Sequence, residues 1–520
     1  MIGQSGWKRE GASEATLTDC WEGWRLRRVE VGIPGFDSLA LGGLPEGRTT
    51  LLAGGTGSGK TVFGLQFLVS GAREFGEPGV LVTFAERPDR LMANSESFGW
   101  DLGGLVDDGR LVIVDARPDP EAVVSGRFDF GGLSSRIAHA LARVEGKRLV
   151  LDPIDALLTG FSAAAEVRRA FASMVSELEP LGATTLLVAE RSGERGYVAR
   201  YGAEEFVVDN VVILRNDLDA EYRRRTVEVL KLRGAEHGKG EFPFVINPKL
   251  GIELVPFSII EAPRDAATER MSLGVRELDE MCGGGIYRDS LVMVTGATGT
   301  GKTLMSAQFI AAGLAAGERG LLLSFEENPS QLTRNARSWG LDLETAQSEG
   351  RLRIISRYPE RVGLEDLLVE IKHNIDEFAP ARFAIDSMTA LEHNSPARAF
   401  REFGVGLTGF LKSRGVGSLM TTTLPSLLGG EHATAVYLST ITDSIIALRY
   451  YDLDSEIRRA VLVLKLRGGA HAHAMHEYEI TDSGMRVLGP IRGVRGILAG
   501  LAVLTPEAGG AEGGHADGQR

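Results

Sequence analysis

The stretch "GGTGSGKT" at residues 54–61 recurs as "GATGTGKT" at residues 296–303. Both copies satisfy the pattern G-x-x-x-x-G-K-[ST], and each lies between a short apolar run and an amphipathic segment. This is the strand–loop–helix context of a phosphate-binding loop. Glycines let backbone N–H groups face the phosphates, and the helix N-terminus adds positive potential. Two matching copies in the same context predict two nucleotide sites rather than a chance glycine-rich turn.

Other repeats extend the duplication along the chain. "VLKLRG" at residues 229–234 recurs unchanged at 463–468, and "FGWDL" recurs loosely as "WGLDL". Because the matches keep their order, they predict tandem domains rather than a solenoid. We expect an N-terminal extension, a first domain, a linker, a second domain and a flexible C-terminal tail, over residues 1–25, 26–250, 251–265, 266–490 and 491–520.

Strand-like and helix-like segments alternate in both halves. "TTLLAG" and "SLVMVTG" enter the glycine-rich loops, amphipathic segments follow, and "GVLVTF" and "RGLLLSF" supply the next strands. Such alternation predicts an α/β fold in which helices cover both faces of a mostly parallel sheet.

Composition sets bounds on the class of protein. Of the 520 residues, 43 % are hydrophobic and 24 % are charged, which is typical of a globular protein. No apolar run is long enough to cross a bilayer, the N-terminus lacks a signal-peptide core, and the two cysteines fit a reducing compartment. The formal net charge of −13 disfavours a nucleic-acid partner. We therefore expect a cytoplasmic protein with neither a membrane nor a nucleic-acid partner.

The two loops predict residues that hold ATP and Mg²⁺. Lys60 and Lys302 would reach the β- and γ-phosphates, and Thr61 and Thr303 would bind the metal. The neighbouring residues expected to contact ATP are Gly57, Ser58, Gly59 and Val62 in the first loop and Thr298, Gly299, Thr300, Gly301 and Leu304 in the second.

Carboxylates follow the apolar strands. Asp152 and Asp386 each end such a strand, where a P-loop NTPase organises its magnesium, although a strand-terminal Asp is often a turn or cap residue. Glu326 and Glu327 lie in "SFEENP", where RecA-like P-loop ATPases place the carboxylate that activates the attacking nucleophile. Glu326 is also a candidate metal ligand.

The first copy of that element reads "TFAERP", with Ala85 before Glu86. One carboxylate of the pair is thus missing, and Glu86 remains the candidate catalytic residue of the first domain. The sequence leaves open which member of the pair does the work.

Each "KLRG" motif places a lysine and an arginine two residues apart on one face of a strand end. These pairs are Lys231 with Arg233, and Lys465 with Arg467. Such cations could absorb the charge that spreads over a γ-phosphate in its transition state. The alternative is a solvated strand edge, which lysine often decorates.

A hydroxyl pair lies near the second of these motifs. "SIIALRYY" and "RRAVLVLKL", joined by a polar turn, predict an antiparallel hairpin that brings Ser439 and Thr440 beside the second "KLRG". The first domain has Glu205 and Phe206 in the corresponding place and therefore lacks these hydroxyls. A Ser–Thr pair that only caps a strand is the alternative.

The segments "LGVRELDEMCGGGIYRDSLVMVTGATGTGKT", "STITDS" and "ARYGAEEFVVDNVVILRN" resemble the KaiC family of circadian clock ATPases and autokinases. The resemblance covers roughly residues 26–490. It implies two stacked RecA-like domains assembled as a hexameric double ring, with ATP between subunits and clock-type or other signalling partners. It also implies autophosphorylation of an adjacent pair, here Ser439 and Thr440.

The resemblance adds further nucleotide contacts. Ser97 and Trp339 would lie near the nucleotide. Residues expected to reach in from the neighbouring subunit are Lys231, Leu232, Arg233 and His237 in the first ring, and Arg459, Lys465, Leu466, Arg467 and Gly468 in the second.

Two readings compete with an autokinase ring. One is a RecA-like ATPase motor on DNA, and the other is a scaffold in which ATP only joins subunits. The histidines of "HAHAMH" at residues 471–476 also leave two options open, a metal site on a strand face or a position near ATP.

Overall fold

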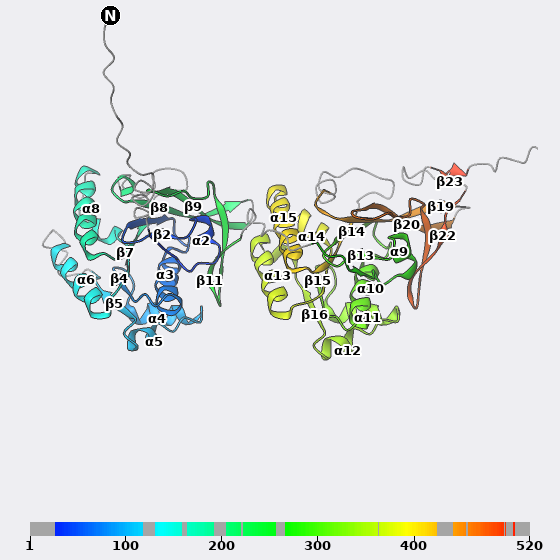
Figure 1. Cartoon of the computed structure of the whole chain (residues 1–520), viewed down its shortest axis with the longest axis horizontal. Helices are drawn as coiled ribbons and strands as arrows, with labels where there is room; N and C mark the ends of the chain where they lie inside the picture. Colours follow the sequence, from blue (N-terminus) through cyan, green and yellow to red (C-terminus); the bar gives the residue numbers. More distant parts are fainter. Residues whose placement is uncertain are drawn as a thin grey trace, which may run out of the picture. The chain divides into compact units, whose positions relative to one another are not determined.

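The computed structural model describes residues 27–117, 130–158, 164–191, 204–219, 222–255, 266–361, 363–423, 440–453, 456–492, 494–495 and 503–504. The chain divides into two units, Met1–Val255 and Pro256–Arg520. Each unit contains a nine-stranded sheet, and the strand order is the same in both (Figure 1). The expected pair of tandem RecA-like α/β domains is confirmed.

In the first unit the sheet order is β11-β10-β9-β8-β3-β7-β6-β4-β5. Within this order, β8, β3, β7, β6, β4 and β5 are all parallel to one another. The pairs β8–β9, β9–β10 and β10–β11 are antiparallel. The strands are β3 (Thr49–Gly54), β4 (Gly79–Thr83), β5 (Leu111–Asp115), β6 (Arg148–Asp152), β7 (Thr184–Glu190), β8 (Asn210–Asp219), β9 (Tyr222–Leu232), β10 (Phe242–Asn247) and β11 (Gly251–Leu254). The main helices are α3 (Lys60–Glu74), α4 (Pro88–Glu96), α5 (Leu102–Asp107), α6 (Phe130–Val144), α7 (Asp155–Leu158) and α8 (Ala164–Leu178).

The second unit repeats this plan, in the order β16-β15-β17-β18-β14-β19-β20-β21-β22. Its strands are β14 (Leu291–Gly296), β15 (Gly320–Ser324), β16 (Leu352–Ser356), β17 (Arg382–Asp386), β18 (Gly417–Thr423), β19 (Ser444–Leu453), β20 (Glu456–Leu466), β21 (His476–Thr481) and β22 (Gly484–Pro490). Its helices are α9 (Arg276–Met281), α10 (Lys302–Ala315), α11 (Pro329–Ser338), α12 (Leu343–Ser348), α13 (Leu364–Phe378), α14 (Met388–His393) and α15 (Ala397–Arg414).

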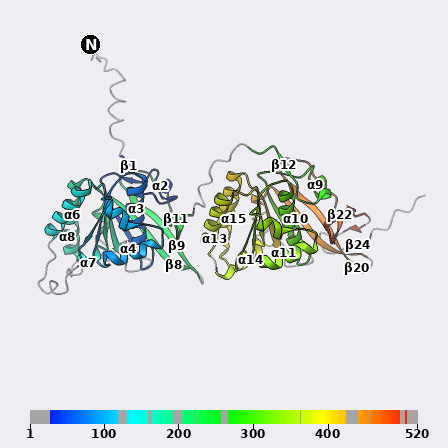
Figure 2. The ribbon, with the colours of Figure 1, turned by 90° about the horizontal axis from the view of Figure 1, so that it is seen from below.

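Helices cover both faces of each sheet because the central strands are apolar on both sides (Figure 2). Successive strand residues point to opposite faces. Leu52 therefore packs in one core with Phe63 of α3, whereas its neighbour Leu51 packs in another with Ile137 of α6 and Phe171 of α8. Among the described residues, no helix is both long enough and apolar enough to span a bilayer.

The parallel pairing brings the phosphate loop and several strand ends to one edge of the sheet. In the second unit Gly296 lies in register with Thr423, and Ser324 with Asp386. The predicted hairpin is confirmed, since β19 and β20 pair antiparallel. Its Lys465 lies opposite Ile445, close to the beginning of β19.

A buried arginine begins the corresponding strand in each unit. Arg382 is 2 % exposed. Its Nε donates to Glu318 at 2.6 Å, and its Nη1 donates to the carbonyls of Ser272 and Phe309 at 2.6 and 2.9 Å. Arg148 makes the matching contacts in the first unit. These side chains tie the strand to the first long helix and to the segment before it.

We predict that Arg382→Ala lowers the free energy of unfolding by about 3 kcal/mol, because a buried carbonyl, a partly buried carbonyl and a carboxylate lose a charged donor. Arg398→Ala is the control, because its ion pair with Glu402 is at the surface and contributes less than about 1 kcal/mol. Urea denaturation followed by circular dichroism measures both. Equal shifts for the two variants would contradict the assigned role of Arg382.

Candidate nucleotide sites

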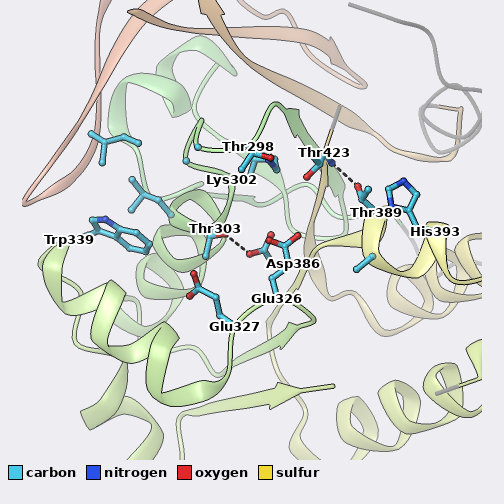
Figure 3. Close-up of a pocket in the computed structure, with 15 residues that line it drawn as sticks. Thr298, Lys302, Thr303, Glu326, Glu327, Trp339, Asp386, Thr389, His393 and Thr423 are labelled. Carbon is cyan, nitrogen blue, oxygen red and sulfur yellow. Dashed lines mark hydrogen bonds between the residues drawn. The ribbon is translucent and has the colours of Figure 1, made fainter. Parts of the chain in front are cut away.

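A cavity of about 500 Å³ lies at the loop edge of the second unit. Figure 3 shows Lys302 and Thr303 of the phosphate loop beside Glu326 and Asp386, which come from other strands. Trp339 lines the same cavity, as the family resemblance implies. The first unit has a smaller cavity of about 200 Å³ in the same place.

Both loops have the backbone that a phosphate-binding loop requires. Gly299 and Gly301 have φ values of 81° and 94°, a region in which a Cβ is strained. Lys302 Nζ donates to the carbonyl of Ala297 at 2.9 Å, and Lys60 Nζ donates to that of Gly54 at 2.8 Å. Burial lowers the pKa of both lysines. Each ammonium therefore lies over its own loop, in position to meet an anionic ligand.

The expected Mg²⁺ ligands are adjacent. Thr303 Oγ1 donates to Asp386 Oδ2 at 2.6 Å, and Thr421 donates to the other oxygen of the same carboxylate. Burial raises the pKa of Asp386, and the two hydroxyls oppose that shift. In the first unit burial likewise raises the pKa of Asp152, opposed by a hydrogen bond from Thr61. Hydroxyl and carboxylate oxygens are hard ligands, so this donor set fits magnesium.

The adjacent glutamates of the second unit have different surroundings. Glu326 accepts a hydrogen bond from Ser387 Oγ at 2.9 Å. Glu327 is held by Asn335, whose amide donates to its two oxygens at 3.1 and 3.2 Å. Burial raises the pKa of Glu327. Glu326 is thus the member of the pair that is tied to the strand carrying Asp386.

The first unit retains only the second arrangement. Glu86 accepts a hydrogen bond from Asn94 at 2.7 Å, as Glu327 does from Asn335. Ala85 therefore occupies the position of Glu326. Pro153 follows Asp152, where the second unit has Ser387 after Asp386. The first site thus has no counterpart of the Glu326 carboxylate or of the Ser387 hydroxyl, and which glutamate does the work stays a prediction.

The "KLRG" cations lie away from the cavity of their own unit. Lys465 Nζ donates to the carbonyl of Thr442 at 2.7 Å, and Arg467 donates to that of Thr440 at 2.9 Å. Lys231 makes the matching contact with Val208 at 2.7 Å. Within the described part of the chain, none of the residues expected to act from a neighbour lines its own cavity: Lys231, Leu232, Arg233, His237, Arg459, Lys465, Leu466, Arg467 and Gly468.

Arg459 lies near the phosphate loop of its own chain. It pairs with Tyr450 across β19 and β20, and its guanidinium lies 5.7 Å from the centre of that ring. The Tyr450 hydroxyl lies 2.8 Å from the position that a Cβ on Gly299 would take. Its counterpart Arg225 donates to the carbonyl of Gly57 at 3.4 Å. Arg459 therefore lies near the loop of its own chain, and its contact with the ATP of a neighbour stays a prediction.

Other expected residues have different outcomes. Ser97 follows α4, donates to the carbonyl of Asn94 at 2.8 Å and does not line the cavity.

Ser439 falls outside the described residues, whereas Thr440 is described and exposed. The rings of His471 and His473 are 4.7 Å apart, but the described residues contain no group of three or more side chains that could hold a metal ion.

Sequence reasoning missed the residues that support the glutamates. Ser387 comes directly after Asp386, but its contact with Glu326 spans 61 positions. Asn94 and Asn335 each follow their glutamate by eight positions. That repeated spacing was present in the sequence and could have distinguished the two glutamates.

A family model described as the KaiC ATPase matches residues 29–258 and again residues 271–491. The chain belongs to the KaiC family. Circadian clock protein KaiC3 of Synechocystis sp. (strain ATCC 27184 / PCC 6803 / Kazusa) is 48 % identical over 485 residues, which cover 93 % of this chain and 96 % of that protein. Circadian clock oscillator protein KaiC of Thermostichus vulcanus is 46 % identical over 476 residues, covering 91 % and 92 %. The KaiC of Synechococcus elongatus (strain ATCC 33912 / PCC 7942 / FACHB-805) is 45 % identical with the same coverage.

Membership of the KaiC family identifies the two cavities as those of ATPase domains, and a KaiC-type ATPase domain binds ATP. The loops, the lysines and the Thr–Asp pairs all lie where such a domain needs them. The first cavity of this KaiC-family chain nevertheless lacks the carboxylate and hydroxyl that the second retains.

We predict that Ser387→Ala lowers ATP turnover at the second site about tenfold, with little change in KM. A hydrogen bond to a charged group contributes about 1.5 kcal/mol, which corresponds to roughly tenfold in rate. The measurement is steady-state hydrolysis in a Lys60→Ala background, and Ser348→Ala, an exposed serine on α12, is the control. A change in KM alone would show that Ser387 acts on binding and not on Glu326.

Proposed function

We propose that this KaiC-family chain binds Mg-ATP in both domains and forms a hexameric ring. In that ring the second domain transfers the γ-phosphate of ATP to Ser439 and Thr440 of an adjacent subunit. The observation that carries the proposal is the separation of Lys465, Arg467 and Thr440 from their own phosphate loop. The relatives are named as circadian clock proteins, and we propose a clock-type or related signalling role in the cytoplasm.

The strand register supports transfer between subunits. Leu448 of β19 lies level with Gly296, the first residue of the loop, whereas Lys465 lies opposite Ile445. Three residues of strand correspond to about 10 Å. Lys465 also points further from the loop, since its ammonium bonds to Thr442, which precedes β19. This separation from their own loop supports the proposal that these cations and the nearby hydroxyl act at the ATP of another chain.

The roles of the residues follow from this arrangement. Lys302 binds the β- and γ-phosphates, and Thr303 and Asp386 would hold Mg²⁺, which neutralises phosphate charge when bound. Glu326, oriented by Ser387, accepts the proton of the attacking hydroxyl. Lys465 and Arg467 of the adjacent subunit stabilise the charge that spreads over the transferred group.

Phosphorylation at this place offers a route from chemistry to a signal. Each phosphate adds about −1.5 to −2 charges at pH 7. Arg467 donates to the carbonyl of Thr440 and lies 3.6 Å from Asp443, so new charge would redistribute these contacts. In a ring that strand end faces the neighbouring subunit, and phosphorylation would alter the subunit contact.

A DNA motor and an ATP-assembled scaffold remain the competing functions. The net charge of −13 disfavours the motor. The oriented Glu326 disfavours a scaffold, which has no use for a general base. A DNA-binding titration at two salt concentrations tests the motor, because phosphate contacts weaken steeply with salt.

We predict that incubation with γ-labelled ATP labels the wild-type chain but not the Ser439→Ala/Thr440→Ala variant. Glu326→Gln should label at most about 1 % as fast, since a general base contributes roughly 10²–10⁴ in rate. Phosphate-mapping mass spectrometry locates the label. Undiminished labelling of the double variant would refute the assignment of the acceptors.

Mixed rings test transfer between subunits. Lys302→Ala chains keep their hydroxyls but lose the donor site, whereas Ser439→Ala/Thr440→Ala chains keep the donor site. Mixing the two should place label on the Lys302→Ala chains. If those chains stay unlabelled in mixed hexamers, transfer within one subunit would replace this proposal.

We further predict that the first site hydrolyses ATP more slowly than the second, by about tenfold or more, because it has no counterpart of the Glu326 carboxylate that Ser387 orients. Lys60→Ala reports the second site and Lys302→Ala reports the first. Ala85→Glu should raise the first-site rate, and adding Pro153→Ser should raise it further by supplying the orienting hydroxyl. A first site as fast as the second would overturn this account of Ala85.

A further inference from the structure

Two carboxylates of the first unit, Asp155 and Glu190, stand where the second unit has threonines. Glu190 ends β7, and its N–H donates to Asp155 Oδ2 at 2.6 Å. In the second unit the N–H of Thr423 donates to Thr389 Oγ1 at 2.7 Å, a contact drawn in Figure 3. The same backbone arrangement thus carries two carboxylates in the first unit and two hydroxyls in the second.

The position of Glu190 is fixed by strand pairing. It lies in register with Gly54, the first residue of the phosphate loop. Lys60 Nζ donates to the Gly54 carbonyl at 2.8 Å, and the N–H of Arg191 donates to the same oxygen at 3.1 Å. Glu190 also lines the cavity together with Ala85 and Pro153. Glu190 and the lysine that would hold the γ-phosphate therefore line the same cavity.

Charge supports this placement. Burial lowers the pKa of Lys60, and three carboxylates oppose that shift. Glu190 has the largest opposing effect of the three, ahead of Asp152 and Asp155. In the second unit the opposing charges on Lys302 are Asp386 and Glu326. Glu190 thus raises the pKa of Lys60 in the first unit, as Glu326 raises that of Lys302 in the second.

We propose that Glu190 is the general base of the first site and that Asp155 positions it. This inference rests on the proposed function, in which the first domain also hydrolyses ATP. Glu86 is the less suitable base, because Asn94 holds it as Asn335 holds Glu327, the glutamate that is not tied to the Asp386 strand. On this proposal the base of the first site lies at the end of β7, whereas that of the second site follows β15.

The step is a hydrolysis. Glu190 removes a proton from a water molecule while the water oxygen forms a bond to the γ-phosphorus. The bond between that phosphorus and the β,γ-bridging oxygen breaks, and its electron pair leaves with ADP. Glu190 then returns the proton to solvent. The Asp155 carboxylate takes no part in the bond changes and fixes the backbone that carries Glu190.

Single-turnover ATP hydrolysis by the full-length Lys302→Ala chain, in which only the first site binds ATP, tests the proposal. Glu190→Gln should lower the rate about a hundredfold or more, with unchanged affinity for ATP. Glu96→Gln, an exposed carboxylate on α4 outside the cavity, is the matched control.

A transplant into the second site gives an independent test. In a Lys60→Ala background, Glu326→Ala/Ser387→Pro should abolish most hydrolysis, and adding Thr389→Asp/Thr423→Glu should restore it at least about tenfold. If the variant binds ATP but hydrolysis is not restored, a glutamate at this strand end cannot act as the base, which would count against Glu190.

Three further outcomes would overturn the proposal. The first is a large loss in Glu86→Gln with none in Glu190→Gln. The second is a Lys302→Ala parent that binds ATP without hydrolysing it, which would make the first site a store of ATP and leave the second-site function intact. The third is a wild-type chain that hydrolyses no ATP at all, which would refute the proposed function itself.

Discussion

Parallel pairing of the central strands is the constraint on which both sites depend. In each unit the strand that enters the phosphate loop lies beside strands running the same way, so their carboxyl ends meet at one edge. That edge receives the loop lysine, the Thr–Asp pair and the carboxylates from segments far apart in the chain. The antiparallel hairpin that follows carries the chain back to the opposite edge, where the "KLRG" cations lie.

Duplication makes the two units a natural comparison, because the backbone is kept while side chains differ. Asn94 and Asn335 hold equivalent glutamates, and the N–H groups of Glu190 and Thr423 find equivalent acceptors. The differences gather around the γ-phosphate end of the cavity. The first unit has alanine and proline where the second has glutamate and serine. It has an aspartate and a glutamate where the second has two threonines. Such clustering indicates altered chemistry rather than drift in packing.

Local patterns predicted most of the fold and half of the site. The phosphate loops, the strand-terminal Asp152 and Asp386 and the β19–β20 hairpin were predicted because each depends on residues close together in the sequence. The contact of Ser387 with Glu326, which distinguishes the surroundings of the two glutamates, was not predicted because strand pairing alone brings these residues together. The position of Arg459 beside Tyr450 was not predicted either, because it depends on the register between β19 and β20.

If the proposed function holds, one subunit cannot carry out the transfer alone, because its nucleotide site and its cations lie at opposite ends of the strands. A site at one edge and its cations and acceptors at the other cannot meet within a rigid sheet. They can meet when the nucleotide site of one subunit faces the cations and acceptors of the next subunit, which is a head-to-tail contact. Such a contact either closes into a ring or continues as a filament. In a closed ring every nucleotide site receives its cations and acceptors through the same subunit contact. Catalysis would therefore favour the closed ring over a filament, and the extent of phosphorylation would depend on the state of the whole assembly.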